Sequence, residues 1–238
     1  MRESGRLLAT VLQAVKAKVE PGVSTKDLAR LAATELAKLG GRPAFLGYQG
    51  FPDVICISIN DEVVHGIPRA DKIIHTGDLV SLDFGVIYED MITDAAITLI
   101  AGKPKQKRHV NLVSHTETAL QVGIDAVHAG VRTGDIGASI ERYLKKYGYG
   151  IVRDLVGHGV GHELHEDPNI PNYGRPDSGP WLNAGLTIAI EPMVTLGTDR
   201  IYIADDDWTV LTADGSWSAH FEHTVLITDT GAEILTCL

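Results

Sequence analysis

The stretch LDFGVIYEDMITDAA, residues 82–96, decides the architecture that the sequence predicts. Two apolar runs, 79–87 and 92–100, flank a polar tip at Tyr88-Glu89, which is typical of a β-hairpin. With that tip, Asp83 and Asp94 should lie directly opposite each other. Two opposed carboxylates in apolar strands repel each other or share a proton, unless a divalent cation lies between them. Two solvated carboxylates at a sheet edge are the alternative.

Helices and further strands are predicted on both sides of this hairpin. Helical spacing of apolar residues predicts helices over 6–19, from Ser24 or Thr25 to Gly40-Gly41, over 107–129 and over 136–147. Strands are predicted over 54–60, 186–191, 208–212 and 219–228. Because the chain has a hairpin and no glycine-rich phosphate loop, an α+β fold is favoured over a parallel dinucleotide-binding sheet.

The two halves of the chain resemble each other. PGVSTKDLA (21–29) aligns with AGVRTGDIG (129–137), and the same offset pairs Asp83 with Glu191. In a shifted register DAAITLI (94–100) resembles EHTVLIT (222–228), which pairs Asp94 with Glu222. We therefore expect one domain, 1–238, built from two pseudo-symmetric halves of roughly 1–105 and 106–238, each contributing acidic residues from its strands.

A histidine for the same site is supplied by GHGVGHELHEDP (157–168). Glycines flank His158 on both sides, so backbone and ligand can come close to it. The spacing differs from that of the HExxH zinc helix, because His165 follows too soon after His162-Glu163. Four carboxylates and one imidazole favour Mn, Fe, Co or Zn over Ca.

The composition limits the function classes. The 238 residues carry 21 Lys+Arg against 31 Asp+Glu, a net charge of −10, which argues against binding to duplex nucleic acid or to an anionic membrane. Two cysteines exclude a disulfide-rich scaffold. The sequence shows neither a signal peptide nor an apolar run long enough to cross a membrane. We expect a cytoplasmic protein.

In this combination the chain resembles the type I methionine aminopeptidases, which belong to the pita-bread (creatinase/aminopeptidase) metallopeptidases. The resembling segments extend over nearly the whole chain in order: PGVSTKDL (21–28), LGYQGFPDVICISINDEVVHGIP (46–68), LDFGVIYEDMITDAA (82–96), GHGVGHELHEDPNIPNYG (157–174), IAIEPMV (188–194) and AHFEHTVLIT (219–228). The resemblance implies an α+β fold with a central antiparallel sheet and outer helices.

The resemblance also implies a metal centre and a mechanism. Two divalent ions (Co, Mn, Fe or Zn) would be held by five ligands, with Asp83 and Glu222 bridging them, and these ligands are Asp83, Asp94, His158, Glu191 and Glu222. A metal-bridging water or hydroxide would attack the first peptide bond. Glu191 would be the general base, His165 would stabilise the oxyanion, and His65 would contact the scissile nitrogen. The other histidines, His162 and His220 among them, receive no role.

A substrate pocket for the methionine side chain follows from the same resemblance. Its residues would be Phe45, Tyr48, Phe51, Cys56, His65, Leu164, His165 and Trp208. The substrate would be the N-terminus of a nascent polypeptide, and removal of the initiator methionine would be fastest before a small second residue. The enzyme would be a monomer that binds neither nucleic acid stably nor membranes, and transient contact with the ribosome is left open.

Two alternatives are kept. An Xaa-Pro aminopeptidase or prolidase shares the fold and the five ligands, but such relatives usually carry an additional N-terminal domain. A catalytically inactive pita-bread binding protein is the second alternative. It would be expected to have lost ligands, whereas this sequence retains all five.

Overall fold

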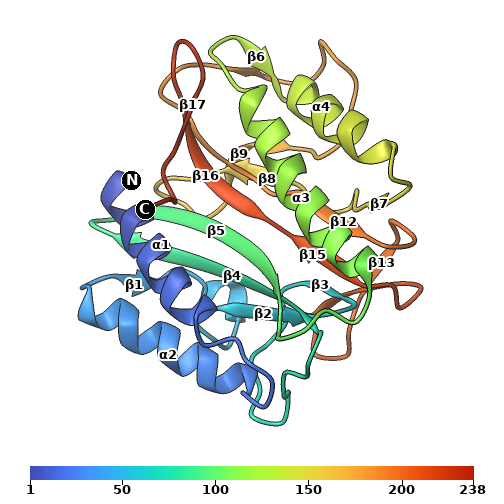
Figure 1. Cartoon of the computed structure of the whole chain (residues 1–238). Helices are drawn as coiled ribbons and strands as arrows, with labels where there is room; N and C mark the ends of the chain where they lie inside the picture. Colours follow the sequence, from blue (N-terminus) through green and yellow to red (C-terminus); the bar gives the residue numbers. More distant parts are fainter.

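The computed structural model describes residues 1–238 as a central antiparallel sheet covered on one face by helices (Figure 1). The helices are α1 (Arg2–Lys16), α2 (Thr25–Lys38), α3 (Lys107–Asp125) and α4 (Thr133–Lys145), and a short 3-10 helix covers Tyr48–Gly50. None of the helices is both long and apolar enough to cross a membrane.

The central sheet has nine strands, and all its pairings are antiparallel. Along the sheet the order is β1-β4-β5-β16-β11-β8-β9, with β2 also beside β4 and β17 also beside β16. The strands are β1 (Arg42–Pro43), β2 (Cys56–Ile59), β4 (Leu79–Tyr88), β5 (Met91–Ile100), β8 (Gly157–Gly159), β9 (Glu166–Ile170), β11 (Thr187–Ile190), β16 (Glu222–Ile227) and β17 (Ala232–Ile234). The repeated segments therefore lie symmetrically about the β5–β16 pair.

Three smaller sheets extend the fold around this centre. Their strands are β10 (Trp181–Leu182) with β6 (Val131–Arg132); β15 (Ser218–His220), β12 (Met193–Thr195) and β7 (Gly150–Ile151); and β13 (Ile201–Ile203), β14 (Val210–Thr212) and β3 (Glu62–Val64). The α+β architecture with a central antiparallel sheet and outer helices is confirmed.

Helices α2 and α4, the second helix of each half, begin in a related way. At the start of α2, the Ser24 hydroxyl accepts a hydrogen bond from the Asp27 N–H at 3.1 Å. At the start of α4, Asp135 accepts a hydrogen bond from the Arg132 N–H at 3.0 Å. Both bonds satisfy backbone donors that a helix end leaves free. Asp27 and Asp135 occupy equivalent positions in the internal repeat, so the repeat preserves helix capping as well as apolar residues.

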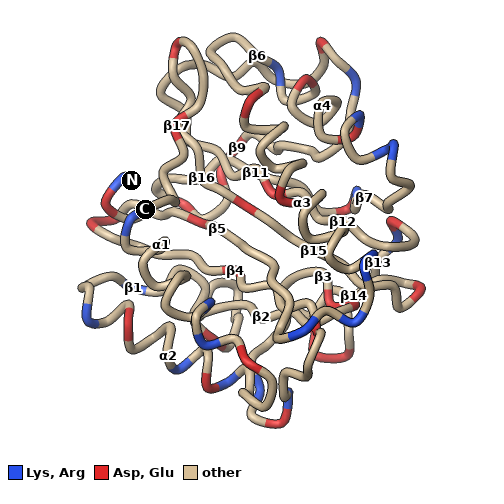
Figure 2. Tube along the Cα trace, viewed as in Figure 1, with Lys and Arg blue, Asp and Glu red and all other residues tan.

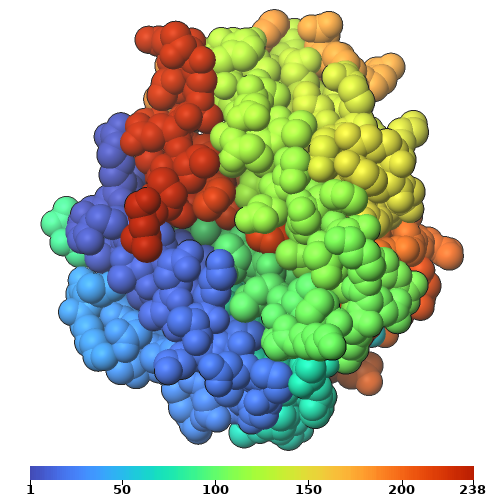
Figure 3. Space-filling view, in the orientation of Figure 1, coloured from blue at the N-terminus to red at the C-terminus, as the bar shows by residue number.

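Each helix pair has its own apolar core. Leu8 and Val11 of α1 and Leu28 of α2 pack on the first half of the sheet, where Phe84 is fully buried. In the second half, residues of α3 and α4 such as Ile140 pack on β11 and β16. Figure 3 shows these helices, together with the C-terminal segment, covering one face of the molecule.

The register of the β4–β5 hairpin corrects one expectation. Asp83 pairs with Ala96, and Asp94 pairs with Gly85, so the two aspartates are diagonal neighbours and are not directly opposed. The turn is at Glu89-Asp90, and both residues have positive φ (47° and 59°), as tight two-residue hairpin turns require. The predicted tip was one position too early. Since this moves the pairing by two residues, both carboxylates still lie on the same face.

Several predicted boundaries also shift. Helix α1 begins at Arg2 instead of residue 6, and α4 begins at Thr133 instead of residue 136. The segment predicted as one strand over 219–228 divides at Phe221 into β15 and β16. These differences arise because polar residues of a first helical turn and breaks between two sheets leave little trace in apolar periodicity.

Candidate active site and metal centre

Strand alternation places three carboxylates on the face of the sheet that the helices leave uncovered. Leu82 and Phe84 point into the core beneath α1 and α2, so Asp83, between them, points to the opposite face. Asp94 of β5 and Glu222 of β16 join it there. Their residues are only 8%, 4% and 2% exposed, respectively. Figure 2 shows acidic residues on β4, β5 and β16 in the middle of the sheet.

The two halves of the sheet are joined beside these carboxylates. The β5–β16 ladder has two residue pairs, of which Glu222 with Ala96 is one. Thr224 extends this junction, because its hydroxyl accepts from the Asp94 N–H at 2.9 Å and donates to the Asp94 carbonyl at 2.8 Å. The ligands from the two halves are thus positioned by direct contact between the halves.

His158 reaches the same face from the short strand β8. Its Nδ1 lies 2.9 Å from the Gly159 carbonyl oxygen, which leaves Nε2 free to bind a metal ion. A Cβ at Gly157 would lie 2.3 Å from the Ala189 carbonyl oxygen, and one at Gly159 would lie 2.5 Å from the Asp167 carbonyl oxygen. The glycines on either side of His158 are therefore required by the close approach of neighbouring backbone.

Several carboxylate oxygens in this cluster have no hydrogen-bond partner, among them Asp83 Oδ1, Asp94 Oδ1 and Glu222 Oε1. No lysine or arginine forms an ion pair with any of the four acidic ligands. Burial, reinforced by the neighbouring carboxylates, raises the pKa of Asp94 to about 8 and holds the pKa values of Asp83 and Glu222 well above their ordinary range.

Such a cluster fits a divalent cation. Ligand atoms of Asp94, His158 and Glu222 all lie within 4.8 Å of one another, and so do those of Glu191, His220 and Glu222. Unpaired buried carboxylates are strongly unfavourable, and a cation would satisfy the free oxygens that the protein leaves. The residues present therefore match a metal centre in donor type, burial and spacing.

The raised pKa values predict how the metal-free protein responds to pH. Burial raises the pKa of Glu191 to about 7, and that of Asp94 is about 8. An acid whose pKa is raised by folding contributes stability that is lost as the pH rises through its folded-state pKa. Between about pH 6.5 and pH 8.5 the carboxylates dominate the change, because histidines, with an ordinary pKa near 6.5, have lost most of their protons in both states by about pH 7.5. We expect the melting temperature to fall by at least about 5 °C over this range.

Calorimetry of chelator-treated protein at the two pH values measures this fall. The metal-loaded protein is the control, because its ligand carboxylates are ionised throughout and should show no such loss. A metal-free melting temperature that rises over the same range would contradict the prediction.

Glu191, immediately after β11, lies between two imidazoles. Its Oε1 is 3.5 Å from His158 Nε2, and its Oε2 is 3.5 Å from His220 Nε2. The backbone of Glu191 is fixed by Asn172, whose side-chain amide donates to the Glu191 carbonyl at 3.0 Å. No role is predicted for His220 from the sequence, yet the structure places it in direct contact with a predicted ligand.

The two predicted auxiliary histidines line the same cavity. His165 Nδ1 lies 2.8 Å from the Tyr48 hydroxyl, and the His165 ring centroid is 4.3 Å from that of His158. His65 has a positive φ of 58°, which is rare for a residue with a side chain and is typical of functional positions. Burial lowers the pKa of His65 to about 4, so its ring is neutral near pH 7.

All the residues predicted for the site line one cavity of about 150 Å³. Beside the ligands and the two histidines, an apolar wall is formed by Phe45, Phe51, Cys56, Leu164 and Trp208, with Tyr48 at its edge. Phe51 packs edge-on against Trp208 at a centroid distance of 5.1 Å. Gln49 also lines the cavity, although no pattern in the sequence points to it.

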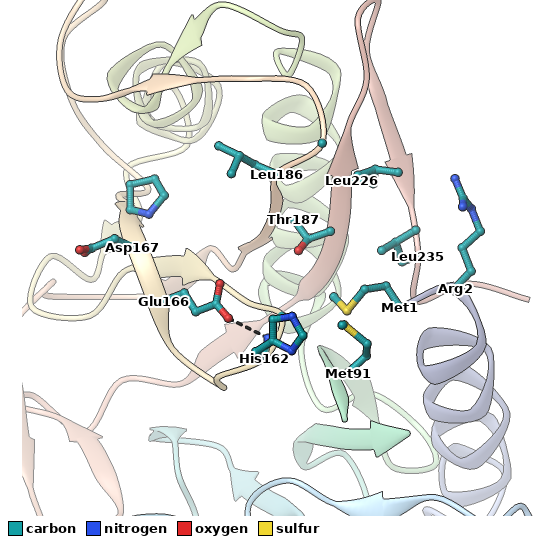
Figure 4. Close-up of a pocket in the computed structure, with 13 residues that line it drawn as sticks. Met1, Arg2, Met91, His162, Glu166, Asp167, Leu186, Thr187, Leu226 and Leu235 are labelled. Atoms are coloured by element: carbon teal, nitrogen blue, oxygen red, sulfur yellow. Dashed lines mark hydrogen bonds between the residues drawn. The ribbon is translucent and has the colours of Figure 1, made fainter. Parts of the chain in front are cut away.

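A larger cleft of about 460 Å³ lies elsewhere on the molecule and contains none of the predicted site residues (Figure 4). Met1, Met91, Leu186 and His162 line it, and the His162 N–H donates to Glu166 at 2.7 Å. The cleft has no group of closely spaced metal-ligating side chains. The chemistry of the molecule is therefore concentrated in the smaller cavity.

Comparisons with known proteins find related sequences over nearly the whole chain. The sequence profile of metallopeptidase family M24 matches residues 1–229. The methionine aminopeptidase of Clostridium acetobutylicum is 46% identical over 236 residues, which cover 99% of this chain and 94% of that protein.

Solved structures give the same result. The crystal structure of the methionine aminopeptidase of Thermotoga maritima superposes with a TM-score of 0.98 at 44% identity and covers 100% of this chain and 95% of that one. A prolidase from Pyrococcus furiosus gives a TM-score of 0.77 at 26% identity, and only 63% of its chain is covered. The similarity to the prolidase is thus more distant and leaves a large part of that protein unmatched.

Proposed function

The chain belongs to metallopeptidase family M24, and on that premise we propose that its cavity binds divalent metal ions and cleaves the first peptide bond of polypeptides that begin with methionine. Its activity is the metal-dependent removal of N-terminal methionine, as the names of relatives at 40–46% identity over nearly the whole chain indicate. An Xaa-Pro peptidase is the distant alternative.

One observation carries the proposal. Three buried carboxylates, the partly buried Glu191 and His158 adjoin an apolar wall within a single cavity, so a metal centre and a side-chain pocket share one space. An Xaa-Pro peptidase would need the same ligands, but the aromatic wall suits a long, flexible thioether side chain. A catalytically inactive protein would have no reason to keep this many unpaired buried acids, because each one destabilises the fold without a cation.

Two ions would share the five ligands. Asp94, His158 and Glu222 would hold one ion together, because a ligand atom of each lies within 4.8 Å of the others, and Asp83 and Glu191 would supply the remaining ligand oxygens of the centre. The bridging role that the family resemblance implies for Asp83 and Glu222 stays a prediction. Bound ions of this kind acidify water and polarise the carbonyl oxygen that is attacked.

Glu191 is proposed to accept the proton of the attacking water on a carboxylate oxygen. This carboxylate lines the cavity beside the other ligands, where it can reach a water molecule as a general base. The same residue can later return the proton to the leaving amine. Its contact with His158 and the bond from Asn172 to its carbonyl keep the carboxylate at the edge of the cavity.

His165 and His65 are proposed to act on the substrate directly. The Tyr48 hydroxyl would donate its hydrogen bond to His165 Nδ1. The proton of the His165 ring then lies on Nε2, and this N–H can donate to the developing oxyanion. His65 is neutral and buried, so it can hydrogen-bond the scissile nitrogen without bringing an additional charge into the site.

The apolar wall is proposed to bind the methionine side chain of the substrate. Phe45 and Phe51 meet edge to face at 6.4 Å, and Trp208 continues the aromatic surface toward His65 at 6.5 Å. Cys56 pairs in register with Asp83, so the wall adjoins the ligands directly. A side chain seated there would bring its own peptide bond to the carboxylates.

The cellular setting is proposed on more general grounds. The substrate would be the N-terminus of nascent polypeptides in the cytoplasm, and the enzyme would act as a monomer with one catalytic domain over 1–238. The net charge of −10 disfavours stable binding to nucleic acid, so any contact with the ribosome would be transient.

Peptide hydrolysis by metal-reconstituted protein tests the function. With Co, Mn, Fe or Zn, a peptide beginning Met-Gly should be cleaved with a higher kcat/KM than a peptide beginning Ala-Pro. The ratio should exceed about 200-fold, because a single methylene in an apolar pocket already discriminates by about 10–200-fold. A preference for the Ala-Pro peptide would transfer the assignment to the Xaa-Pro peptidases. Failure to cleave either peptide with all four metals would favour the inactive binding protein.

A further inference from the structure

His220 is a buried imidazole for which the mechanism above has no use. It ends strand β15, two residues before Glu222, and is 1% exposed. Neither Nδ1 nor Nε2 has a hydrogen-bond partner. A buried polar group without a partner is costly, and such groups are concentrated at functional sites.

The backbone holds this ring firmly in place. The His220 N–H donates to the Thr98 hydroxyl at 2.9 Å, and that hydroxyl donates to the His220 carbonyl at 2.7 Å. His220 also pairs in register with Met193 of β12. The ring is thus fixed at the junction of the two sheets, where its Nε2 points to Glu191 Oε2 at 3.5 Å.

The two imidazoles beside Glu191 differ in their relation to the cavity. His158 lines the cavity and lies beside Oε1, whereas His220 is not among the lining residues and lies beside Oε2. Ligand atoms of His220, Glu191 and Glu222 lie within 4.8 Å of one another, but His220 does not line the cavity, so its position suits an outer-shell donor to Glu191 better than a direct ligand. An imidazole in this position can present an Nε2–H to the carboxylate oxygen beside it.

We propose that His220 is a positioning residue for Glu191, and that its Nε2–H donates to Oε2 so that Oε1 stays directed at the metal centre beside His158. This rests on the proposed function, because it assigns Glu191 to that centre. The contact is 3.5 Å long, and it would shorten to a charge-assisted hydrogen bond once the carboxylate is bound to an ion. His220 would thereby fix the orientation of the residue that both binds metal and accepts the proton.

Two substitutions distinguish a His220 that donates a hydrogen bond to Glu191 from a His220 that binds the metal ion itself. His220→Gln keeps an N–H donor at similar reach, whereas His220→Leu fills similar space without a donor. The control is His223→Leu, which removes a neighbouring histidine whose Nδ1 contacts the Thr236 hydroxyl at 2.8 Å and which makes no contact with Glu191. For each variant, the dissociation constant for Co²⁺ is measured by titration calorimetry, together with the visible absorption of bound Co²⁺.

We expect His220→Leu to weaken Co²⁺ binding by about 10–100-fold, as removal of an outer-shell partner does elsewhere. His220→Gln should bind close to wild type with an unchanged Co²⁺ spectrum, and its kcat should recover with its affinity. His223→Leu should bind like wild type.

Two outcomes would overturn the proposal. If His220→Leu binds Co²⁺ as tightly as wild type, His220 has no influence on Glu191. If Gln and Leu weaken binding equally and both change the Co²⁺ spectrum, His220 is itself a ligand. Metal binding is measured without substrate, so this result is independent of the function test: a wild-type protein that binds Co²⁺ but cleaves no methionyl peptide would refute the proposed function alone.

Discussion

A His158→Ala variant is expected to lose its divalent metal, whereas a His165→Ala variant is expected to keep its metal and to lose turnover. The rings lie close together, but His158 Nε2 is directed at Glu191 and His165 Nδ1 contacts Tyr48. Loss of a direct ligand should weaken Co²⁺ binding by more than about 100-fold, because loss of an outer-shell partner alone costs about 10–100-fold. Loss of an oxyanion donor should lower kcat by about 10²–10³-fold.

Metal content after dialysis and steady-state kinetics at saturating Co²⁺ distinguish the two variants. His128→Ala is a suitable control, because that histidine is exposed and lies outside the cavity. The assignment of the metal centre would be wrong if His158→Ala and His165→Ala both bound metal and turned over at the wild-type rate.

Replacing Glu191 with glutamine should lower kcat by about 10²–10⁴-fold, the contribution of a positioned general base. The amide keeps the size of the side chain but cannot accept the proton of water. KM should change little, because the apolar wall that receives the side chain is intact. The same substitution removes a buried charge, so metal-free Glu191→Gln should melt at a higher temperature than metal-free wild type at pH values above about 7, the pKa of Glu191.

Kinetics and metal analysis on a single preparation keep the two roles of Glu191 apart. A variant that retains metal but not turnover supports the role as base, and Glu117→Gln on the exposed side of α3 controls for the loss of a surface carboxylate. Normal turnover by Glu191→Gln would exclude Glu191 as the proton acceptor.

Much of the fold could be predicted from the sequence because local patterns determined it. The apolar runs on each side of residues 88–91 predicted β4 and β5 closely, and the internal repeat pointed to two related halves. The position of the turn was missed, since it depends on two residues with positive φ, Glu89 and Asp90, whose side chains do not require that conformation. Turn chemistry of this kind is weakly encoded in the sequence.

The acidic residues and His158 could be predicted from their strand context and the internal repeat, whereas the substrate pocket was predicted only through the family resemblance, and the structure brings all of them to one cavity. His220 was missed because in SAHFEHT it resembles any polar residue of an alternating strand. Its contact with Glu191 joins residues far apart in the chain, and no spacing rule indicates such a contact. The Tyr48–His165 contact was missed for the same reason. Patterns along the chain predict which residues matter, whereas partners across the fold require the structure.

The junction between the two halves also sets an order of events during synthesis. Chains emerge from the ribosome N-terminus first, so the β4–β5 hairpin exists before β16 is made. Until β16 adds to β5, Asp83 and Asp94 lack Glu222 and Thr224. A copy interrupted before residue 222 would be unable to assemble the centre. Binding of metal at this centre therefore requires that synthesis has continued past residue 222.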